Sequence, residues 1–71
     1  MQKETFLHKL GKRIKQIRAE KGLTQTELAH KAGKDSQSVE RVENGKTNPS
    51  AYYLMEIAKA LNVPLKELFD F

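Results

Sequence analysis

The sequence contains no cysteine and no long run of apolar residues. The first absence excludes disulfide bonds and metal sites built from thiolates. The second excludes a membrane-spanning helix, which needs roughly 20 consecutive apolar residues. The opening residues Met1–Thr5 also lack the apolar core of a signal peptide. With 71 residues, the chain has room for one domain. We therefore expect a single domain over residues 1–71, soluble and cytoplasmic, with no membrane contact.

Groups that carry out catalysis or bind metals are scarce as well. The two histidines, His8 and His30, are isolated from each other. The serines occupy positions that suit helix caps or the surface, so no nucleophile has a base and an orienting group nearby. No spacing of histidines and acids is typical of a metal site. The sequence therefore predicts a protein that is not an enzyme, with no metal and no cofactor.

Positive charge is concentrated in the first third of the chain. Residues 1–24 contain seven lysines and arginines against two acids, a net charge of +5. Residues 25–49 are neutral and residues 50–71 carry a net charge of −1, so the formal total is +4. This distribution favours one side that faces a polyanion such as nucleic acid. The alternative is an ordinary solvated helix face, and charge alone does not separate the two.

Helical spacing of apolar residues runs through the sequence, and no segment shows the alternation of a β-strand. In the first segment, Leu7, Leu10, Ile14 and Ile17 form one stripe at intervals of three and four residues. We expect five helices, at about residues 4–21, 25–32, 36–44, 50–61 and 64–69. Their other inward residues are expected to be Leu28, Ala29, Ala32, Val39, Val42, Leu54, Ile57, Ala58 and Leu61. The predicted fold class is all-α.

Residues that begin and end helices separate these segments. Gly22 follows the first helix, as a C-terminal glycine does. Thr24 and Glu27 have the spacing of a capping box, in which each side chain bonds the backbone amide of the other residue. Gly33 suits a turn, and Asp35 suits the N-cap of the third helix. The second and third helices are thus predicted to be short and joined by a turn of about three residues.

Residues between Gln25 and Val42 meet the packing needs of a helix-turn-helix. Ala29 is small, and a larger side chain there would hold the two helices apart. Gly33 lies in the turn, where a positive φ is costly for a residue with a Cβ. Val39 and Val42 lie three residues apart and can close the second helix of the motif onto the first. Together these offsets predict a helix-turn-helix.

The remaining side of the third helix is polar. On a helical wheel, one arc of roughly 140° holds only side chains that can form hydrogen bonds. They are Ser36, Gln37, Glu40, Arg41 and Asn44. An α-helix fits the major groove of DNA, whose floor offers donors and acceptors to such a face. The arc is either an ordinary solvated face or a reading face, and its place on the second helix of the motif favours double-stranded DNA as the partner.

Several blocks of residues between Leu10 and Phe69 form a set. They are Ile14–Arg18, Gly22–Gln25, Glu27–Ala29, Ala32–Gly33, Val39–Lys46, Asn48–Ser50 and Ile57–Leu61. In this order they resemble the Xre/Cro-type helix-turn-helix family, which includes the lambda-type phage repressors. The resemblance implies a compact five-helix, lambda-repressor-like domain. It also implies a regulator of transcription, expected to be a repressor, that binds a palindromic operator as a homodimer.

The resemblance assigns roles to residues of the third helix. Ser36, Gln37 and Arg41 occupy the usual base-reading positions. Arg41 can make a bidentate contact to guanine and Gln37 to adenine, each worth about 1–3 kcal/mol of discrimination. The Ser36 hydroxyl can either donate or accept a hydrogen bond, so it discriminates less between bases. Glu40 is the fourth candidate, either as an acceptor from cytosine N4 or, in the interpretation we favour, as a residue that orients Arg41.

Phosphate contacts are expected on both flanks of that helix. Gln25 resembles the family residue that bonds a phosphate and braces the start of the reading helix. Asn44 and Lys46 resemble loop positions that hold the DNA backbone. Lys34 departs from the family, which usually has an apolar residue there, so it faces either solvent or a phosphate. The predicted phosphate-binding residues are Thr24, Gln25, Lys34, Asn44, Lys46 and Thr47.

Arg18 and Glu43 resemble the structural ion pair that joins the first and third helices in the family. If that pair is buried, losing one partner should cost roughly 3–5 kcal/mol and cause unfolding, not altered specificity. A second departure from the family follows Ala51. Of Tyr52 and Tyr53, we expect one to fill space beside that alanine and the other to meet phosphate or solvent.

The end of the chain is unusually apolar for so small a domain. Because a single reading helix buries little DNA surface, we expect two copies to read half-sites about 34–36 Å apart. The predicted dimer-interface residues are Tyr53, Leu65, Leu68, Phe69 and Phe71, with Phe6 as a further candidate. Exposed apolar patches usually mark interaction sites. The alternative is that these side chains cover the core of the monomer, a role that suits Leu68 and Phe69.

A rival function within the same family involves a protein partner. Some members are antitoxins, which bind and neutralise a partner toxin while repressing their own operon. An antitoxin commonly carries an added toxin-binding segment, and here only Met1–Lys9 and the last few residues are spare. We therefore prefer sequence-specific binding of double-stranded DNA, by a restriction–modification controller or a small phage-type repressor. The antitoxin with its partner toxin is the alternative.

Overall fold

The computed structural model describes residues 1–71 as four α-helices followed by one short 3-10 helix. The α-helices are α1 (Lys3–Glu20), α2 (Gln25–Ala32), α3 (Ser36–Glu43) and α4 (Ala51–Leu61), and the 3-10 helix is η1 (Leu65–Phe69). The all-α class agrees with the prediction, whereas the count of five helices was slightly off, because the segment predicted at residues 64–69 is a 3-10 helix over Leu65–Phe69. That segment winds more tightly, as short helical pieces often do.

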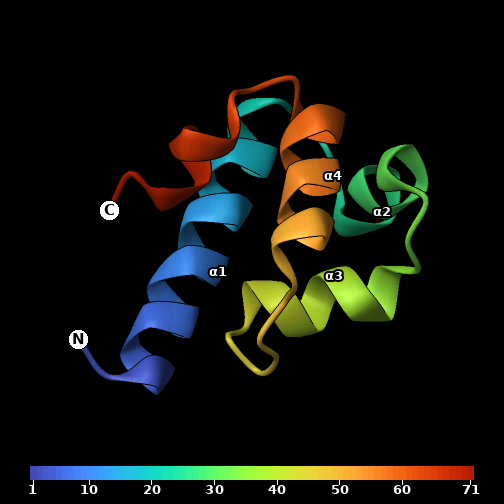
Figure 1. Cartoon of the computed structure of the whole chain (residues 1–71). Helices are drawn as coiled ribbons and strands as arrows, with labels where there is room; N and C mark the ends of the chain where they lie inside the picture. The colour runs from blue at the N-terminus through green and yellow to red at the C-terminus, as the bar shows by residue number, and fades with distance from the viewer.

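α3 lies across one end of the molecule (Figure 1). α1 and α2 both pack against α3, and α2 also packs against α4. η1 folds back to contact α1 and α4 at the other end. None of the helices combines the length and the apolar character that crossing a membrane would require. The arrangement leaves one long side of α3 without a neighbouring helix.

Side-chain caps and a left-handed glycine set the ends of α2 and α3, as predicted. The Thr24 hydroxyl accepts from the Glu27 amide at 3.0 Å, and the Thr24 amide donates to the Glu27 carboxylate at 2.8 Å. This completes the capping box at the start of α2. Asp35 Oδ1 accepts from the Ser38 amide at 2.8 Å and caps α3. Gly33 ends α2 with a φ of 69°, which glycine adopts at little cost.

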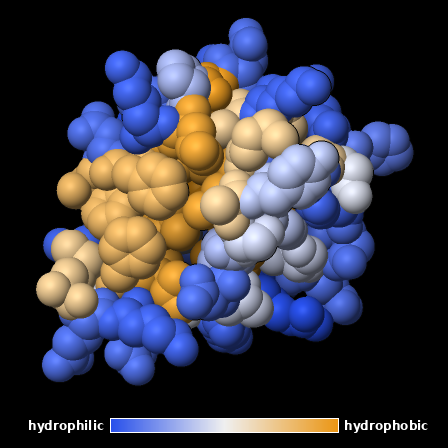
Figure 2. Space-filling model, viewed as in Figure 1, coloured by the Kyte–Doolittle hydropathy of each residue, from blue (hydrophilic) through white to orange (hydrophobic).

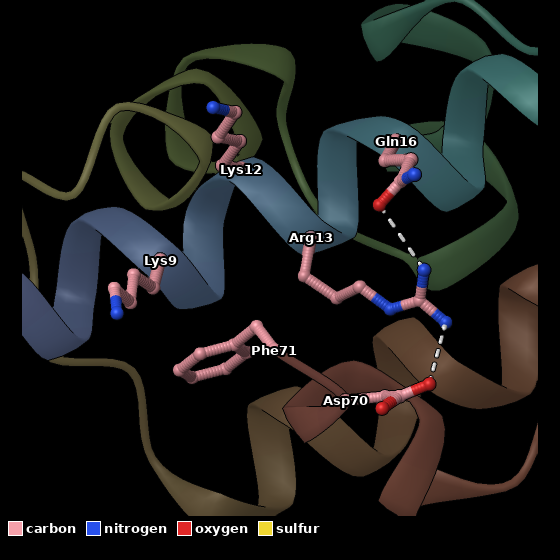
Figure 3. A pocket seen from close by; sticks show the side chains of 6 residues that line it. All are labelled: Lys9, Lys12, Arg13, Gln16, Asp70 and Phe71. Atoms are coloured by element: carbon pink, nitrogen blue, oxygen red, sulfur yellow. Dashed lines mark hydrogen bonds and ion pairs between the residues drawn. The ribbon is translucent and has the colours of Figure 1, made fainter.

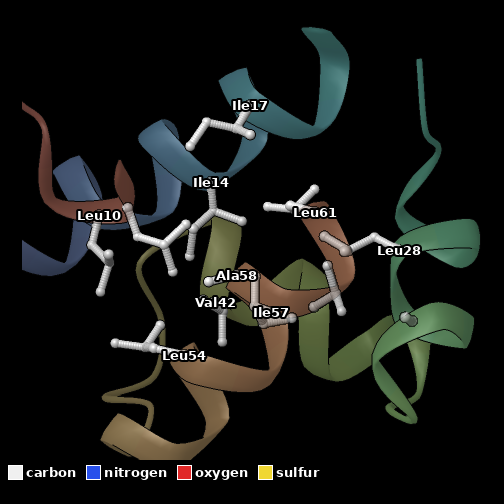
Figure 4. Packing of buried hydrophobic residues seen from close by; sticks show 12 residues of the cluster. Leu10, Ile14, Ile17, Leu28, Val42, Leu54, Ile57, Ala58 and Leu61 are labelled. Carbon is white, nitrogen blue, oxygen red and sulfur yellow. The ribbon is translucent and has the colours of Figure 1, made fainter. Parts of the chain in front are cut away.

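The helices enclose one apolar core, whose side chains are shown in Figure 4. Its members are Leu10, Ile14, Ile17, Leu28, Ala29, Val39, Val42, Leu54, Ile57, Ala58, Leu61 and Leu68. Apart from half-buried Ala32, the inward residues predicted for the α-helices are buried. Leu68 is 0 % exposed because η1 folds back over the core. Its assignment to a dimer interface was therefore wrong, since Leu68 covers the core of its own monomer.

The crossing of α1 and α3 is unusually close at Gly11. A Cβ built on this residue would lie 2.3 Å from the carbonyl oxygen of Val42 and 2.4 Å from that of Glu43. No side chain larger than hydrogen fits there without moving one helix. The sequence analysis did not single out Gly11, because nothing in its local sequence marks the contact.

Arg13 ties the last residues of the chain to α1. Its Nε donates to the Glu67 carbonyl at 2.8 Å, and its Nη2 lies 3.3 Å from Glu67 Oε2 and 3.9 Å from Asp70 Oδ2. Its Nη1 donates to Gln16 Oε1 at 3.1 Å. The charge of Arg13 is therefore used inside the molecule, although it contributed to the basic segment counted in the sequence.

Candidate nucleic-acid interface

α2, the turn and α3 form a helix-turn-helix whose inner faces are buried. Leu28 and Ala29 of α2 and Val39 of α3 belong to the core. The Lys34 amide donates to the Ala29 carbonyl at 2.8 Å, which closes the turn around the left-handed Gly33. α3 is thereby fixed with its outer side facing away from the other helices (Figure 1).

The outer side of α3 is the polar arc expected from the sequence. Ser36, Gln37, Glu40, Arg41 and Asn44 are all exposed. The ion pairs of the molecule use none of them, so their donors and acceptors are free for a partner. Glu40 forms no ion pair with Arg41, so the structure offers no support for the idea that Glu40 orients that arginine. The predicted base-reading residues thus lie together on one accessible face.

A buried ion pair fixes the end of α3 against α1. Arg18 Nε and Nη2 donate to the two carboxylate oxygens of Glu43 at 2.7 and 3.0 Å. Its Nη1 donates to the Leu23 carbonyl at 2.7 Å. The Glu43 side chain is 1 % exposed, so its charge depends on this partner. The structure therefore contains the ion pair predicted between the first and third helices.

Gln25 joins the same cluster from the start of α2. Its Nε2 donates to Glu43 Oε1 at 2.9 Å. Because Glu43 is the last residue of α3, Gln25 braces the end of the reading helix, and the prediction that it braces the start was wrong. One of the two amide hydrogens of Gln25 is used in this bond, which leaves one for a phosphate.

Lys34 is engaged within the protein and is not a free phosphate contact. Its Nζ lies 2.6 Å from Glu56 Oε1 and 5.0 Å from the centre of the Tyr53 ring. The contact with the Glu56 side chain raises the pKa of Lys34 above its ordinary value of 10.5. That Glu56 oxygen is sealed from solvent and has no aligned hydrogen-bond donor, so the lysine charge is what offsets its burial. Neither predicted role, solvent-facing or phosphate-binding, describes this residue, which ties the turn to α4.

The other predicted phosphate contacts lie at two places around α3. Thr24 is exposed at the start of α2, where the helix dipole favours an anion, although its hydroxyl oxygen already serves as the cap. Asn44 and Lys46 are exposed just after α3, and Thr47 is half-buried beside them. Lys46 has no carboxylate partner in the structure. It is the free cation of this set.

Ser38 and Tyr53 form a hydroxyl pair that the sequence analysis missed. Ser38 Oγ and Tyr53 OH lie 2.7 Å apart and join α3 to α4. Tyr53 is half-buried there and lies on α4, so its assignment to a dimer surface stays a prediction that its contact with Ser38 does not support. It is also the tyrosine that fills space, whereas Tyr52 is 67 % exposed. Only the register of α4 against α3 brings the two hydroxyls together, and no local pattern reveals that register.

Three exposed aromatic side chains cluster on one side of the molecule, and we call them the aromatic patch. They are Phe6, Phe69 and Phe71, each between 37 % and 46 % exposed. The ring centres of Phe6 and Phe69 are 6.4 Å apart, and those of Phe6 and Phe71 are 5.7 Å apart. Figure 2 shows an apolar area where the start of α1 and the end of the chain meet. Two predicted dimer residues, Phe69 and Phe71, therefore lie together here with Phe6, and a third, Leu65, is exposed at the start of η1.

A basic hollow of about 500 Å³ adjoins this patch (Figure 3). Its lining residues are Lys9, Lys12, Arg13, Gln16, Asp70 and Phe71. Lys9, Arg13 and Gln16 are on the side of α1 opposite to Gly11, which packs against α3. Part of the positive charge of α1 thus points away from the reading face. The interpretation of residues 1–24 as one polyanion-facing surface does not hold for these side chains.

Comparisons with known proteins agree with this geometry. The model of the helix-turn-helix family matches residues 14–68. An uncharacterized HTH-type transcriptional regulator of Archaeoglobus fulgidus is 41 % identical over 59 residues, covering 83 % of this chain and 84 % of the relative. The HTH-type transcriptional regulator SinR of Bacillus subtilis is 42 % identical over 62 residues, covering 86 % of this chain and 56 % of SinR. The chain thus spans little more than half of SinR.

Among solved structures, the restriction-modification controller protein C.AhdI from Aeromonas hydrophila is similar in both fold and sequence. The two superpose with a TM-score of 0.88 at 40 % identity, over 89 % of this chain and 96 % of the other. The family match also spans α2, the turn and α3, the elements that form the motif described above. The chain belongs to the helix-turn-helix family of DNA-binding transcriptional regulators, of the Xre type that its sequence blocks resemble.

Proposed function

We propose that this protein binds a specific double-stranded DNA site by placing α3 in the major groove. The supporting observation is the exposed polar arc on the second helix of the motif, which no other element covers. In this proposal Arg41 reads guanine, Gln37 reads adenine and Ser36 adds a less specific contact. Glu40 borders them as an acceptor that suits cytosine N4.

The DNA backbone is held from both ends of the motif. Lys46 and Asn44 follow α3 and reach phosphates on one flank, while Thr24 and the spare amide hydrogen of Gln25 face a phosphate near the start of α2. Phosphate contacts position a protein on the duplex without reading sequence. Asn44 closes the polar arc of α3, whereas Thr24, Gln25 and Lys46 lie outside it, so most of the positioning contacts are separate from base reading.

The protein acts as a homodimer on a palindromic operator. One helix of eight residues buries little DNA, and a two-fold pair gains affinity by reading two half-sites. The aromatic patch supplies the apolar surface for such a pair, with Phe69 and Phe71 as its main contacts and Phe6 beside them. The exposed Leu65 of η1 is a further candidate for the interface. A two-fold interface uses the same patch on both copies.

Bound at such an operator, the protein represses transcription by occupying the site. It catalyses no reaction in this role, and it uses no cofactor. Of the relatives named above, two are described as transcriptional regulators and one as a controller protein. No feature of the structure favours the antitoxin alternative, which is therefore not carried further.

Selection from random DNA duplexes tests this proposal directly. The protein should enrich a palindromic sequence whose half-sites are centred about 10–10.5 base pairs apart. Native mass spectrometry of the selected complex should give two protein chains per duplex. Phe69→Asp should abolish the two-chain complex, and because Phe69 is only 40 % exposed and stacks on Phe6, circular dichroism must show that the variant is still folded. If selection enriches no sequence above random duplexes, the proposed function is wrong.

A further inference from the structure

A second, smaller hollow lies between α3 and the start of α4, and we call it the hydroxyl hollow. It has a volume of about 210 Å³ and is lined by Ser38, Arg41, Val42, Thr47, Pro49 and Tyr53. It adjoins the reading arc, because Ser38 and Val42 follow Arg41 around the circumference of α3. The lining contains three hydroxyl groups and one cation but no carboxylate.

The hydroxyl pair in this hollow always has one hydrogen to spare. Ser38 Oγ and Tyr53 OH share a single hydrogen bond of 2.7 Å, and either oxygen can be its donor. Each hydroxyl carries one hydrogen, so one of the two remains unused in both arrangements. A spare O–H beside an arginine suits an anionic oxygen acceptor.

The neighbours of Tyr53 hold its hydroxyl in place before any ligand arrives. The Tyr53 amide donates to Ser50 Oγ at 3.0 Å, in the cap of α4. Lys34 lies 5.0 Å from the centre of the tyrosine ring and is neutralised by Glu56. The lysine therefore steadies the ring without itself competing for the anion. The start of α4, next to the hollow, adds the partial positive charge of a helix N-terminus.

We propose that the hydroxyl hollow seats one backbone phosphate of the bound duplex, beside the bases read by α3. The spare hydrogen of the Ser38–Tyr53 pair and the Thr47 hydroxyl would face its oxygens. The bidentate contact of Arg41 to guanine uses two of its five N–H donors, so its positive charge and remaining donors would border the same phosphate. Val42 and Pro49 form the apolar wall. This proposal rests on the proposed function and deepens it, because it makes Tyr53 a DNA contact in place of Lys34.

A scan of uncharged phosphates tests the proposal on the operator obtained by selection. Duplexes are made with one methylphosphonate at each successive position, and each is bound by the wild type, Tyr53→Phe and Ser38→Ala. Tyr52→Phe is the matched control, because Tyr52 is exposed and makes no hydrogen bond through its hydroxyl group. Urea midpoints check that every variant is folded.

We expect Tyr53→Phe to weaken binding of the unmodified operator about tenfold, as loss of one hydrogen bond to a charged group does. The selected sequence should be unchanged. When the methylphosphonate replaces one particular phosphate in each half-site, the wild type and both variants should bind the duplex with equal affinity. Tyr52→Phe should bind every duplex of the scan with the affinity of the wild type.

Three outcomes overturn the proposal. A folded Tyr53→Phe variant that binds like the wild type shows that the hydroxyl contacts no phosphate. If the variants bind every duplex of the scan more weakly than the wild type by the same factor, the hydroxyl pair acts only by holding α3 in place. A changed sequence preference shows a base contact instead. In all three, the wild type still binds its operator, so the proposed function stands; failure to find any operator overturns both proposals.

Discussion

Gly11 of α1 lies so close to Val42 of α3 that a methyl group would not fit between them. A Cβ on Gly11 would lie 2.3 Å from the Val42 carbonyl oxygen. Replacing glycine by alanine inside a helix usually stabilises a protein by about 0.5–1 kcal/mol. Here we expect Gly11→Ala to lower the free energy of unfolding by about 1–3 kcal/mol, because the atoms in the way belong to the backbone of α3.

Urea denaturation measures this effect. Thr5→Ala, at an exposed position of the same helix, is the control and should leave the midpoint nearly unchanged. An equal or higher midpoint for Gly11→Ala would show that α1 and α3 are farther apart than described.

The Arg18–Glu43 ion pair predicts a strong effect on stability and none on sequence preference. Arg18→Met leaves the Glu43 carboxylate buried without its partner and should cost about 3–5 kcal/mol. The double variant Arg18→Met/Glu43→Leu should recover much of that loss, since no charge remains buried. Lys15→Met, at an exposed position of α1, is the control. The pair would be unimportant if Arg18→Met unfolded at the urea midpoint of the wild type.

Lys46 and Lys34 are predicted to differ in their contribution to DNA binding. Lys46 is exposed and unpaired, whereas Lys34 is paired with Glu56. Lys46→Ala should reduce the slope of log affinity against log salt by about 1, the effect of losing one phosphate contact. Lys34→Ala should lower the melting temperature and leave that slope unchanged. A titration of DNA binding against salt concentration measures this slope for both variants. A reduced slope for Lys34→Ala would show that Lys34 does contact a phosphate.

The capping box predicts a loss of stability in acid. The backbone amide of Thr24, and then its hydroxyl, lower the pKa of Glu27 below its ordinary value of 4.5. Because the folded protein favours the charged form, this contribution is present above pH 4.5 and is lost as the pH falls through the lowered pKa. Glu27→Gln keeps an acceptor but does not titrate. The melting temperature of the wild type relative to this variant should therefore fall between pH 5 and pH 2, and a constant difference would contradict the assignment.

The parts of the fold that follow from local chemistry could be predicted from the sequence. The capping box of Thr24 and Glu27 and the left-handed Gly33 depend on neighbours within a few residues. The buried valines of α3 follow from their spacing, and so does the exposed arc opposite them. These elements were predicted to within a residue or two because the interactions that form them are short in sequence.

The contacts that join distant segments could not be predicted in the same way. Arg13 bonds Glu67 across 54 positions, and Ser38 meets Tyr53 across 15. The contact of Lys34 with Glu56 was missed because that carboxylate lies on another helix. Such pairings depend on how the helices dock, which the spacing of apolar residues does not determine.

Sequence reading by α3 is tested most directly by parallel selections from random duplexes with the wild type and Arg41→Ala. Lys12→Ala is the matched control, because Lys12 lines the basic hollow of α1 and not the reading face. The wild type and Lys12→Ala should enrich the same motif. Arg41→Ala should lose the preference for guanine at one position in each half-site and weaken binding there by about 1–3 kcal/mol. An identical motif from the wild type and Arg41→Ala would show that this face of α3 does not read the DNA through Arg41.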